Sequence, residues 1–198
     1  GTINEMTFYN AVPADDAYGE AHLAEWGDPS TSPHFAVGWA WALDTPFQWT
    51  KQVASHWGGT RNGTIIHWPE GIEAKGEVRD QFHHVIDIVP TIADATGIGA
   101  PNTVDGVAQK PVEGVSMGYT FDKANADTPS TRRTQYFEML GNRGIYHDGW
   151  YANTRPISAP WDLAGIASSD VINAYPWELY HVAVDPSVLG GVHVKIGD

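Results

Sequence analysis

The chain has 198 residues, of which 42% are hydrophobic and 18% charged, so it has the composition of a globular protein and not of a disordered tail. Its 24 acidic and 11 basic residues give a formal net charge of −13, which repels nucleic-acid phosphates and anionic lipid surfaces. We therefore expect no nucleic acid and no membrane among its partners. The absence of cysteine excludes disulfides, zinc thiolate sites and cysteine nucleophiles.

The N-terminal part predicts one short helix and one apolar segment. Residues 13–27 favour a helix that Asp15 or Asp16 caps and Gly27 ends. The longest apolar run follows at residues 35–43, and about nine residues are too few to cross a bilayer. We expect a soluble protein of the cytoplasm or the periplasm. Within this run Trp39 and Trp41 alternate as on a strand, and core packing is the expected use of both, with a border to an aryl group as the alternative.

A stronger helix signal begins at Thr45, which is followed by Pro46 and Gln48 in the order of a capping box. We expect this helix to run to about His56, with Lys51 in its middle, and to break at Gly58-Gly59. Residues 64–68 then predict a short buried strand that ends at Pro69.

The next helix is expected near residues 80–96, with Asp87 as its cap and Pro90 in its first turn. Gly97 follows the last apolar position and predicts the end of this helix. Residues 98–131 are rich in Gly, Pro, Asn and Asp and predict a long connecting loop.

After this loop the pattern changes to the alternation of strands. Three antiparallel strands are expected, at 134–140, 144–147 and 150–154. We expect Gly141-Asn142 to join the first two and Asp148-Gly149, a type I′ hairpin signal, to join the last two. Residues 177–182 could add a fourth strand. The expected fold is α/β over residues 1–125, followed by a small antiparallel subdomain over residues 126–198.

Several side chains could do chemistry, namely Lys51, His56, Arg61, the pair His83/His84 with Asp87, and Asn142-Arg143. Each also has a structural explanation. Lys51 fits a solvated surface charge, Arg61 fits a salt bridge, and Asp87 fits a helix cap. His83 and Asp87 have i,i+4 spacing, but no third metal ligand lies near them in sequence. We therefore expect no metal site in this chain, and its residues offer no convincing nucleophile.

Residues 44–61 read DTPFQWTKQVASHWGGTR, and this stretch resembles bacterial arylsulfatases of the alkaline phosphatase superfamily. Three later stretches resemble the same family in the same order. These are HVIDIVPTI at 84–92, EGVSM at 113–117, and ELY at 178–180 with Asp185-Pro186. The resemblance covers roughly residues 33–187 and implies the C-terminal part of an alkaline-phosphatase-like sulfatase fold.

The resemblance implies hydrolysis of sulfate esters by a formylglycine nucleophile beside a divalent cation, calcium or magnesium. Of the family's functional residues only Lys51 has a counterpart here, the lysine that binds the sulfate oxygens. His56 and Arg61 follow closely and are expected to line the mouth of the pocket as substrate-binding residues.

The departures from the family pattern are equally informative. No Cys/Ser-x-Pro-x-Arg sequence exists in the chain, and no Asp-Asp metal pair follows an expected strand. The resemblance implies that the family's second metal motif, Asp-Asn-Gly, would stand just before Gly1. We therefore expect the chain to be a piece of a longer hydrolase and inactive alone, with the nucleophile and the metal ligands upstream. Its partners would be the remainder of the catalytic domain and a small-molecule sulfate ester.

Two alternatives remain open at this point. The parent could be a phosphonate monoester or phosphodiester hydrolase of the same superfamily. The chain could also be a non-catalytic carbohydrate-binding or interaction module that uses its nine tryptophans.

Overall fold

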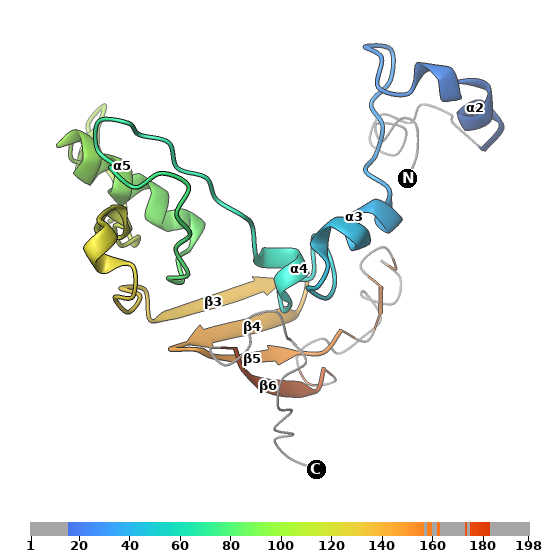
Figure 1. The fold of residues 1–198 in the computed structure, drawn as a ribbon. Coiled ribbons are helices and arrows are strands. Elements are labelled where there is room, and N and C mark those ends of the chain that lie inside the picture. Colours follow the sequence, from blue (N-terminus) through green and yellow to red (C-terminus); the bar gives the residue numbers. More distant parts are fainter. Residues whose placement is uncertain (1–15, 157, 160–161, 163–172, 174, 183–198) are drawn as a thin grey trace.

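The computed structural model describes residues 16–156, 158–159, 162, 173 and 175–182. These residues form a mixture of short helices and antiparallel strands, with a four-stranded sheet at the centre (Figure 1). One arm of the chain leaves the sheet with α2 and α3, and another carries α5. Among the described residues, no helix has the length and apolar character that a membrane span requires.

The four-stranded sheet has the order β3-β4-β5-β6 and is antiparallel throughout. Its strands are Thr134–Met139, Asn142–His147, Trp150–Thr154 and Trp177–His181, which confirms the four predicted strands. Asp148 and Gly149 both have positive φ, 44° and 85°, as a type I′ turn requires. The first turn is built by Leu140 and Gly141, one residue earlier than predicted.

One face of this sheet supplies the main core. Its buried members are Trp57, Tyr151, Tyr180 and Val182, with Phe47, Phe137 and Tyr146 packed against them. Trp57 meets Tyr151 edge to face, with ring centroids 5.9 Å apart, a favourable geometry for aromatic rings. The core therefore forms between the C-terminal sheet and a segment about a hundred residues earlier.

The N-terminal arm contains α2 (Asp16–Ala21), the 3₁₀ helix η1 (Leu23–Glu25) and α3 (Val37–Asp44). Gly27, at φ 93°, follows η1 as predicted, while Asp15 lies outside the described residues. Trp39 and Trp41 lie in the helix α3 and not on a strand, and they are 66% and 69% exposed, so the expected core packing is wrong. A border to an aryl group stays a prediction.

The predicted helix over 45–56 is also wrong. Thr45 ends α3 instead, donating its hydroxyl to Trp41 O at 2.8 Å, and the following residues form turns. The glycines expected to break the helix lie inside a single helical turn, α4 (Trp57–Thr60). Burial of Trp57 against the sheet outweighs the local capping signal at Thr45.

The buried strand predicted at 64–68 does not form. Its residues have no strand partner, and Ile65 is 96% exposed. A single extended segment leaves its backbone groups unpaired, so a strand requires a neighbour that the described residues do not provide.

The second arm begins with the 3₁₀ helix η2 (Val85–Asp87) and α5 (Ile88–Thr96), and Gly97, at φ 68°, ends α5 as predicted. The expected long loop is mostly irregular but contains a two-stranded hairpin of β1 (Thr103–Val104) and β2 (Val107–Ala108). Two further 3₁₀ helices follow, η3 (Gly118–Phe121) and η4 (Lys123–Asn125).

Candidate functional site: the lysine loop

Lys51 lies in a turn and is exposed to solvent. No ion pair between described residues includes it, although the chain is strongly acidic. We call residues 48–60, which carry it, the lysine loop. An exposed ammonium without a carboxylate beside it is available to an anion.

Backbone hydrogen bonds close the lysine loop upon itself. Gly58 N donates to Gln48 O at 3.0 Å, His56 N to Val53 O at 3.1 Å, and Gly59 N to His56 O at 3.0 Å. The first of these joins the two ends of the loop. Lys51 therefore extends from a compact turn and not from the middle of a helix.

The two glycines permit this closure. A Cβ on Gly58 would lie 1.9 Å from Trp49 O, and one on Gly59 would lie 2.3 Å from Val53 O. Both positions require glycine because another backbone segment occupies the space of a side chain. The Gly58-Gly59 pair thus serves the closure of the loop, whereas the sequence predicted that it breaks a helix.

The inner side of the lysine loop is buried and polar. Ser55 is fully buried and His56 is 2% exposed, and Ser55 Oγ lies 2.9 Å from His56 Nδ1. Burial lowers the pKa of His56 to about 4, so the ring is neutral at pH 7. In this structure His56 does not reach the surface, in contrast to the predicted place at a pocket mouth.

Arg61 follows α4 and is exposed. Its guanidinium carbon lies 4.8 Å from the ring centroids of both Phe47 and Trp57. The two rings fix the guanidinium by cation–π contact near the lysine loop. Arg61 and His56 therefore belong to the same local structure as Lys51, with Arg61 outside and His56 inside.

A second cluster centres on the buried carboxylate of Asp87. It accepts from Arg132 Nε at 2.7 Å, from His84 N at 2.9 Å and from Val115 N at 2.8 Å. These bonds, led by the one from Arg132, outweigh the cost of burial and lower the pKa of Asp87 far below its usual range. His83 Nδ1 lies 3.1 Å from the same carboxylate, so this pair serves the cluster and not a metal ion.

The same cluster joins two of the stretches that resembled the sulfatase pattern. Thr91 donates to Asp87 O at 2.6 Å and accepts from Met117 N at 2.9 Å. A Cβ on Gly114 would lie 2.1 Å from Ile86 O, so only glycine fits there. Residues 84–92 and 113–117 thus form one structural unit.

The remaining predicted site residues, Asn142 and Arg143, begin β4. Asn142 is 5% exposed, and the Arg143 guanidinium carbon lies 5.2 Å from the Trp177 ring centroid. Arg143 lies on the sheet face opposite the lysine loop, because successive strand residues alternate between faces and the next residue, Gly144, pairs with Asn153.

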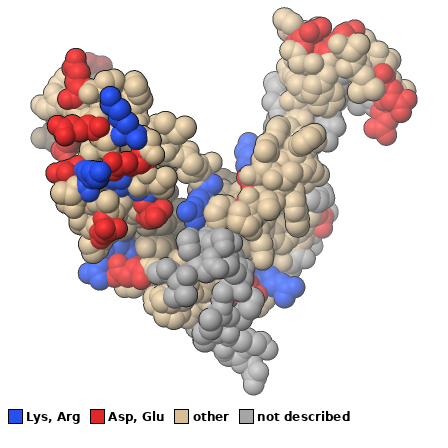
Figure 2. All heavy atoms as spheres, viewed as in Figure 1, with Lys and Arg blue, Asp and Glu red and all other residues tan. Residues whose placement is uncertain are grey.

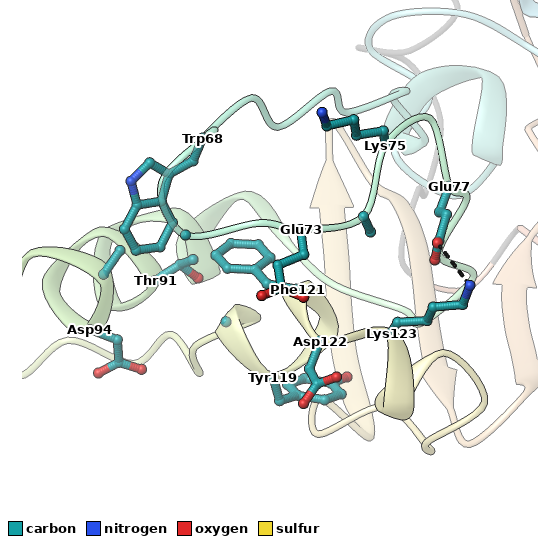
Figure 3. Close-up of a pocket in the computed structure, with 14 residues that line it drawn as sticks. Trp68, Glu73, Lys75, Glu77, Thr91, Asp94, Tyr119, Phe121, Asp122 and Lys123 are labelled. Carbon is teal, nitrogen blue, oxygen red and sulfur yellow. Dashed lines mark ion pairs between the residues drawn. The ribbon is translucent and has the colours of Figure 1, made fainter.

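An open cleft of about 800 Å³ lies in the α5 arm (Figure 3). Its lining includes Trp68, Glu73, Asp94, Tyr119, Phe121 and Asp122. None of Lys51, His56 and Arg61 contributes to it. The cleft is rich in carboxylates, which disfavours an anionic substrate, so it and the lysine loop are separate features.

The described part of the chain offers no donor set for the metal that the resemblance implies. Among the described residues, no group of three His, Asp or Glu side chains could hold a metal ion. We therefore assign no chemistry of this chain to a bound metal, and the lysine loop by itself supplies positive charge and hydrogen-bond donors.

Sequence reasoning missed Arg132, Ser55 and Asn153. Arg132 is 9% exposed and pairs with Asp87 across 45 residues, while Asn153 Nδ2 donates to Ser55 O across 98 residues. The only available signal for Asn153 was an amide side chain at an inward position of a predicted strand. Such a side chain requires a buried partner.

Comparison with known proteins places the lysine loop in a family context. The family model described as Sulfatase matches residues 22–98. No curated protein matches the chain. The matched residues include α3, the whole lysine loop and α5. Residues 22–98, which contain Lys51, His56 and Arg61, are thus similar to the Sulfatase family, and we call them the sulfatase-like segment.

Proposed function

We propose that this chain is part of the catalytic domain of an arylsulfatase-like sulfuric ester hydrolase, in which Lys51 binds the sulfate group. The observation that carries the proposal is the place of Lys51. Its side chain is exposed on a compact loop whose inner side is buried, and it lies inside the segment that matches the sulfatase family.

The chemistry suits an ammonium group at this position. Hydrolysis of a sulfate ester moves negative charge onto the sulfate oxygens and the leaving oxygen. A fixed cation there stabilises the transition state more than the ground state, and removal of one such donor typically costs about 10²- to 10³-fold in turnover. The lysine loop fixes the backbone of Lys51 in advance, so little reorganisation is needed.

The formylglycine nucleophile and the calcium or magnesium ligands belong, in this proposal, to the remainder of the catalytic domain. Several large apolar side chains are exposed, which supports the proposal that further protein covers them. Trp39, Trp41 and Leu43 of α3 are 66%, 69% and 71% exposed, and Ile65 is 96% exposed. Soluble monomers rarely expose such apolar clusters, so these residues are suited to contact with further protein.

His56 and Arg61 take different roles in this proposal. Because the His56 ring is buried, it supports the loop from within. Arg61 is exposed and held over two aromatic rings, so it remains a candidate substrate-binding residue beside Lys51.

The test is hydrolysis of 4-nitrophenyl sulfate with calcium present. Three proteins are compared: the product of the gene extended upstream, its Lys51→Ala variant, and the 198-residue chain. We expect Lys51→Ala to lower kcat/KM by about 10²- to 10³-fold. We expect the short chain to be inactive. Lys110→Ala, an exposed lysine outside the sulfatase-like segment, is the matched control and should retain activity.

Other outcomes would redirect the assignment. Faster hydrolysis of a phenylphosphonate monoester or of bis(4-nitrophenyl) phosphate would favour the phosphonate and phosphodiester hydrolases. Unchanged activity of Lys51→Ala, or turnover by the 198-residue chain alone, would overturn the proposed role of Lys51.

A further inference from the structure

The lysine loop contains backbone geometry that it cannot maintain alone. Trp49 has φ 65° and Gln52 has φ 80°, and these two residues lie on either side of Thr50 and Lys51. Positive φ is unfavourable for a residue other than glycine and persists where surrounding structure enforces it. The loop therefore needs an anchor outside residues 48–60.

The anchor lies on the inner face of the C-terminal sheet. Asn153 of β5 is fully buried, and its Nδ2 donates to the backbone carbonyl of Ser55 at 2.9 Å. The neighbouring position in β4 is Gly144, where a Cβ would lie 3.4 Å from Ser55 Cα. This spacing is ordinary van der Waals contact, so the loop packs directly against β4 beside Asn153. Glycine is required at position 144 because a Cβ there would lie 2.3 Å from Tyr151 Oη.

Besides Trp57, which packs on Tyr151, Ser55 is a point at which the sheet holds the loop. Its carbonyl accepts from Asn153, and its hydroxyl lies 2.9 Å from His56 Nδ1. His56 N in turn donates to Val53 O at 3.1 Å, and Val53 N to Thr50 O at 3.2 Å. A continuous set of hydrogen bonds thus leads from β5 to the residue before Lys51.

We propose that Asn153 is a positioning residue for Lys51: its amide holds the Ser55 carbonyl and thereby fixes the turn that presents the ammonium group to a sulfate ester. The inference deepens the proposed function and rests on it. Asn153 itself does not touch substrate, because its side chain is fully buried beneath the loop. Loss of the amide leaves the buried Ser55 carbonyl without this donor, and the loop relaxes.

The matched control is Thr154, the next residue of β5. It is equally buried, and its hydroxyl is hydrogen-bonded to the backbone of Arg143, on the opposite face from the lysine loop. Thr154→Val therefore removes a buried hydrogen bond from the same strand without touching the loop. Asn153→Thr, which suits a strand and lacks the amide, replaces Asn153→Ala if the latter does not fold.

The first measurement is a double-mutant cycle in the upstream-extended protein with 4-nitrophenyl sulfate. We expect Asn153→Ala to lower kcat/KM about tenfold with Lys51 present and to have no further effect in Lys51→Ala. Thr154→Val should leave kcat/KM nearly unchanged. An equal loss from Asn153→Ala in both backgrounds indicates a merely structural role and overturns the proposal.

The second measurement needs no activity and separates the two proposals. Amide hydrogen exchange in the 198-residue chain is compared at Val53, His56, Gly58 and Gly59, whose N–H groups hold the loop. Faster exchange in Asn153→Ala than in Thr154→Val supports the anchor, and equal exchange overturns it. If the anchor is found but Lys51→Ala does not affect hydrolysis, the proposed function fails and the link between Asn153 and catalysis fails with it.

Discussion

His56 makes the lysine loop sensitive to acid. Its buried ring keeps the proton off down to a pKa of about 4, against 6.5 for an exposed histidine. As the pH falls, the unfolded chain therefore binds this proton first. The stability associated with His56 is fully present above about pH 6.5 and is lost between pH 6.5 and 4.

The size of this loss is measurable. A difference of 2.5 pKa units corresponds to about 3 kcal/mol of unfolding free energy. We expect urea unfolding, followed by tryptophan fluorescence, to show a fall in stability between pH 6.5 and 4 that His56→Gln reduces. His67→Gln, at an exposed histidine, is the control and should leave the fall in place. Burial lowers the pKa of His84 as well, so only the difference between variants isolates His56.

Arg132 and Arg133 are neighbours in sequence, but we expect only Arg132 to contribute strongly to the free energy of unfolding. Arg132 pairs with the fully buried Asp87, whereas Arg133 pairs with Asp148 at the surface. Arg132→Met leaves a buried carboxylate uncompensated, so we expect a loss of about 3–5 kcal/mol in unfolding free energy.

Arg133→Met is the matched control for this effect. Its ion pair is solvent-exposed and should change the urea midpoint little. Equal midpoints for the two variants would show that the Asp87 cluster does not hold the second arm to the sheet.

At the scale of single elements, the Asp148-Gly149 turn decides the register of β4 and β5. Gly149 has φ 85°, which costs an L-residue roughly 1–2 kcal/mol. We expect Gly149→Ala to lower the unfolding free energy by about that amount in urea titration. Gly63→Ala, at a glycine with open space around its Cα and no positive φ, should have a smaller effect.

The sheet was predictable from sequence because its information is local. Alternating strands and Asp148-Gly149 specify a hairpin within a few residues, and the structure contains it. The helix predicted from Thr45 failed because Trp57 packs on Tyr151 and Ser55 accepts a hydrogen bond from Asn153, both in a strand that comes much later. Single-sequence capping signals do not include such contacts.

The candidate site also contains residues that the sequence predicts and a residue that only the structure reveals. Lys51, His56 and Arg61 were found because they lie in one short stretch that resembles sulfatases. Asn153 was not found, because its relation to Ser55 exists only in three dimensions. The strand predicted at 64–68 failed for a related reason. Its local pattern is typical of a strand, but no partner strand lies beside it among the described residues.

Over the whole molecule, the two predicted subdomains at residues 1–125 and 126–198 share much of their stabilising structure. The lysine loop packs on β5, and Asp87 pairs with Arg132. In the first case Asn153 of the later segment donates to Ser55 of the lysine loop, and in the second Arg132 of the later segment donates to Asp87. The C-terminal sheet therefore acts as a platform for the sulfatase-like segment.

The exposed apolar surface of α3 predicts self-association of the isolated chain. Figure 2 shows this helix as a largely uncharged surface, while acidic side chains gather on α2 and acidic and basic side chains are mixed on the α5 arm. We expect sedimentation velocity to show species larger than a monomer as concentration rises, more strongly in salt, which screens the net charge of −13.

Replacing Trp39, Trp41 and Leu43 together with glutamine should shift this distribution toward the monomer. Lys110→Ala serves as the control and should not change it. A monomer at all concentrations in the unmodified chain would show that α3 is not a contact surface.

The 98 residues between Ser55 and Asn153 also set an order of events during synthesis. A ribosome adding about 5–20 residues per second needs roughly 5–20 s to make that stretch. Throughout this interval the lysine loop is outside the ribosome, or leaving it, without the strand that shapes it. Its apolar residues Val53 and Trp57 remain available to chaperones or to other nascent chains. Translation that stops before β5 would therefore produce a chain that contains Lys51 but cannot present it.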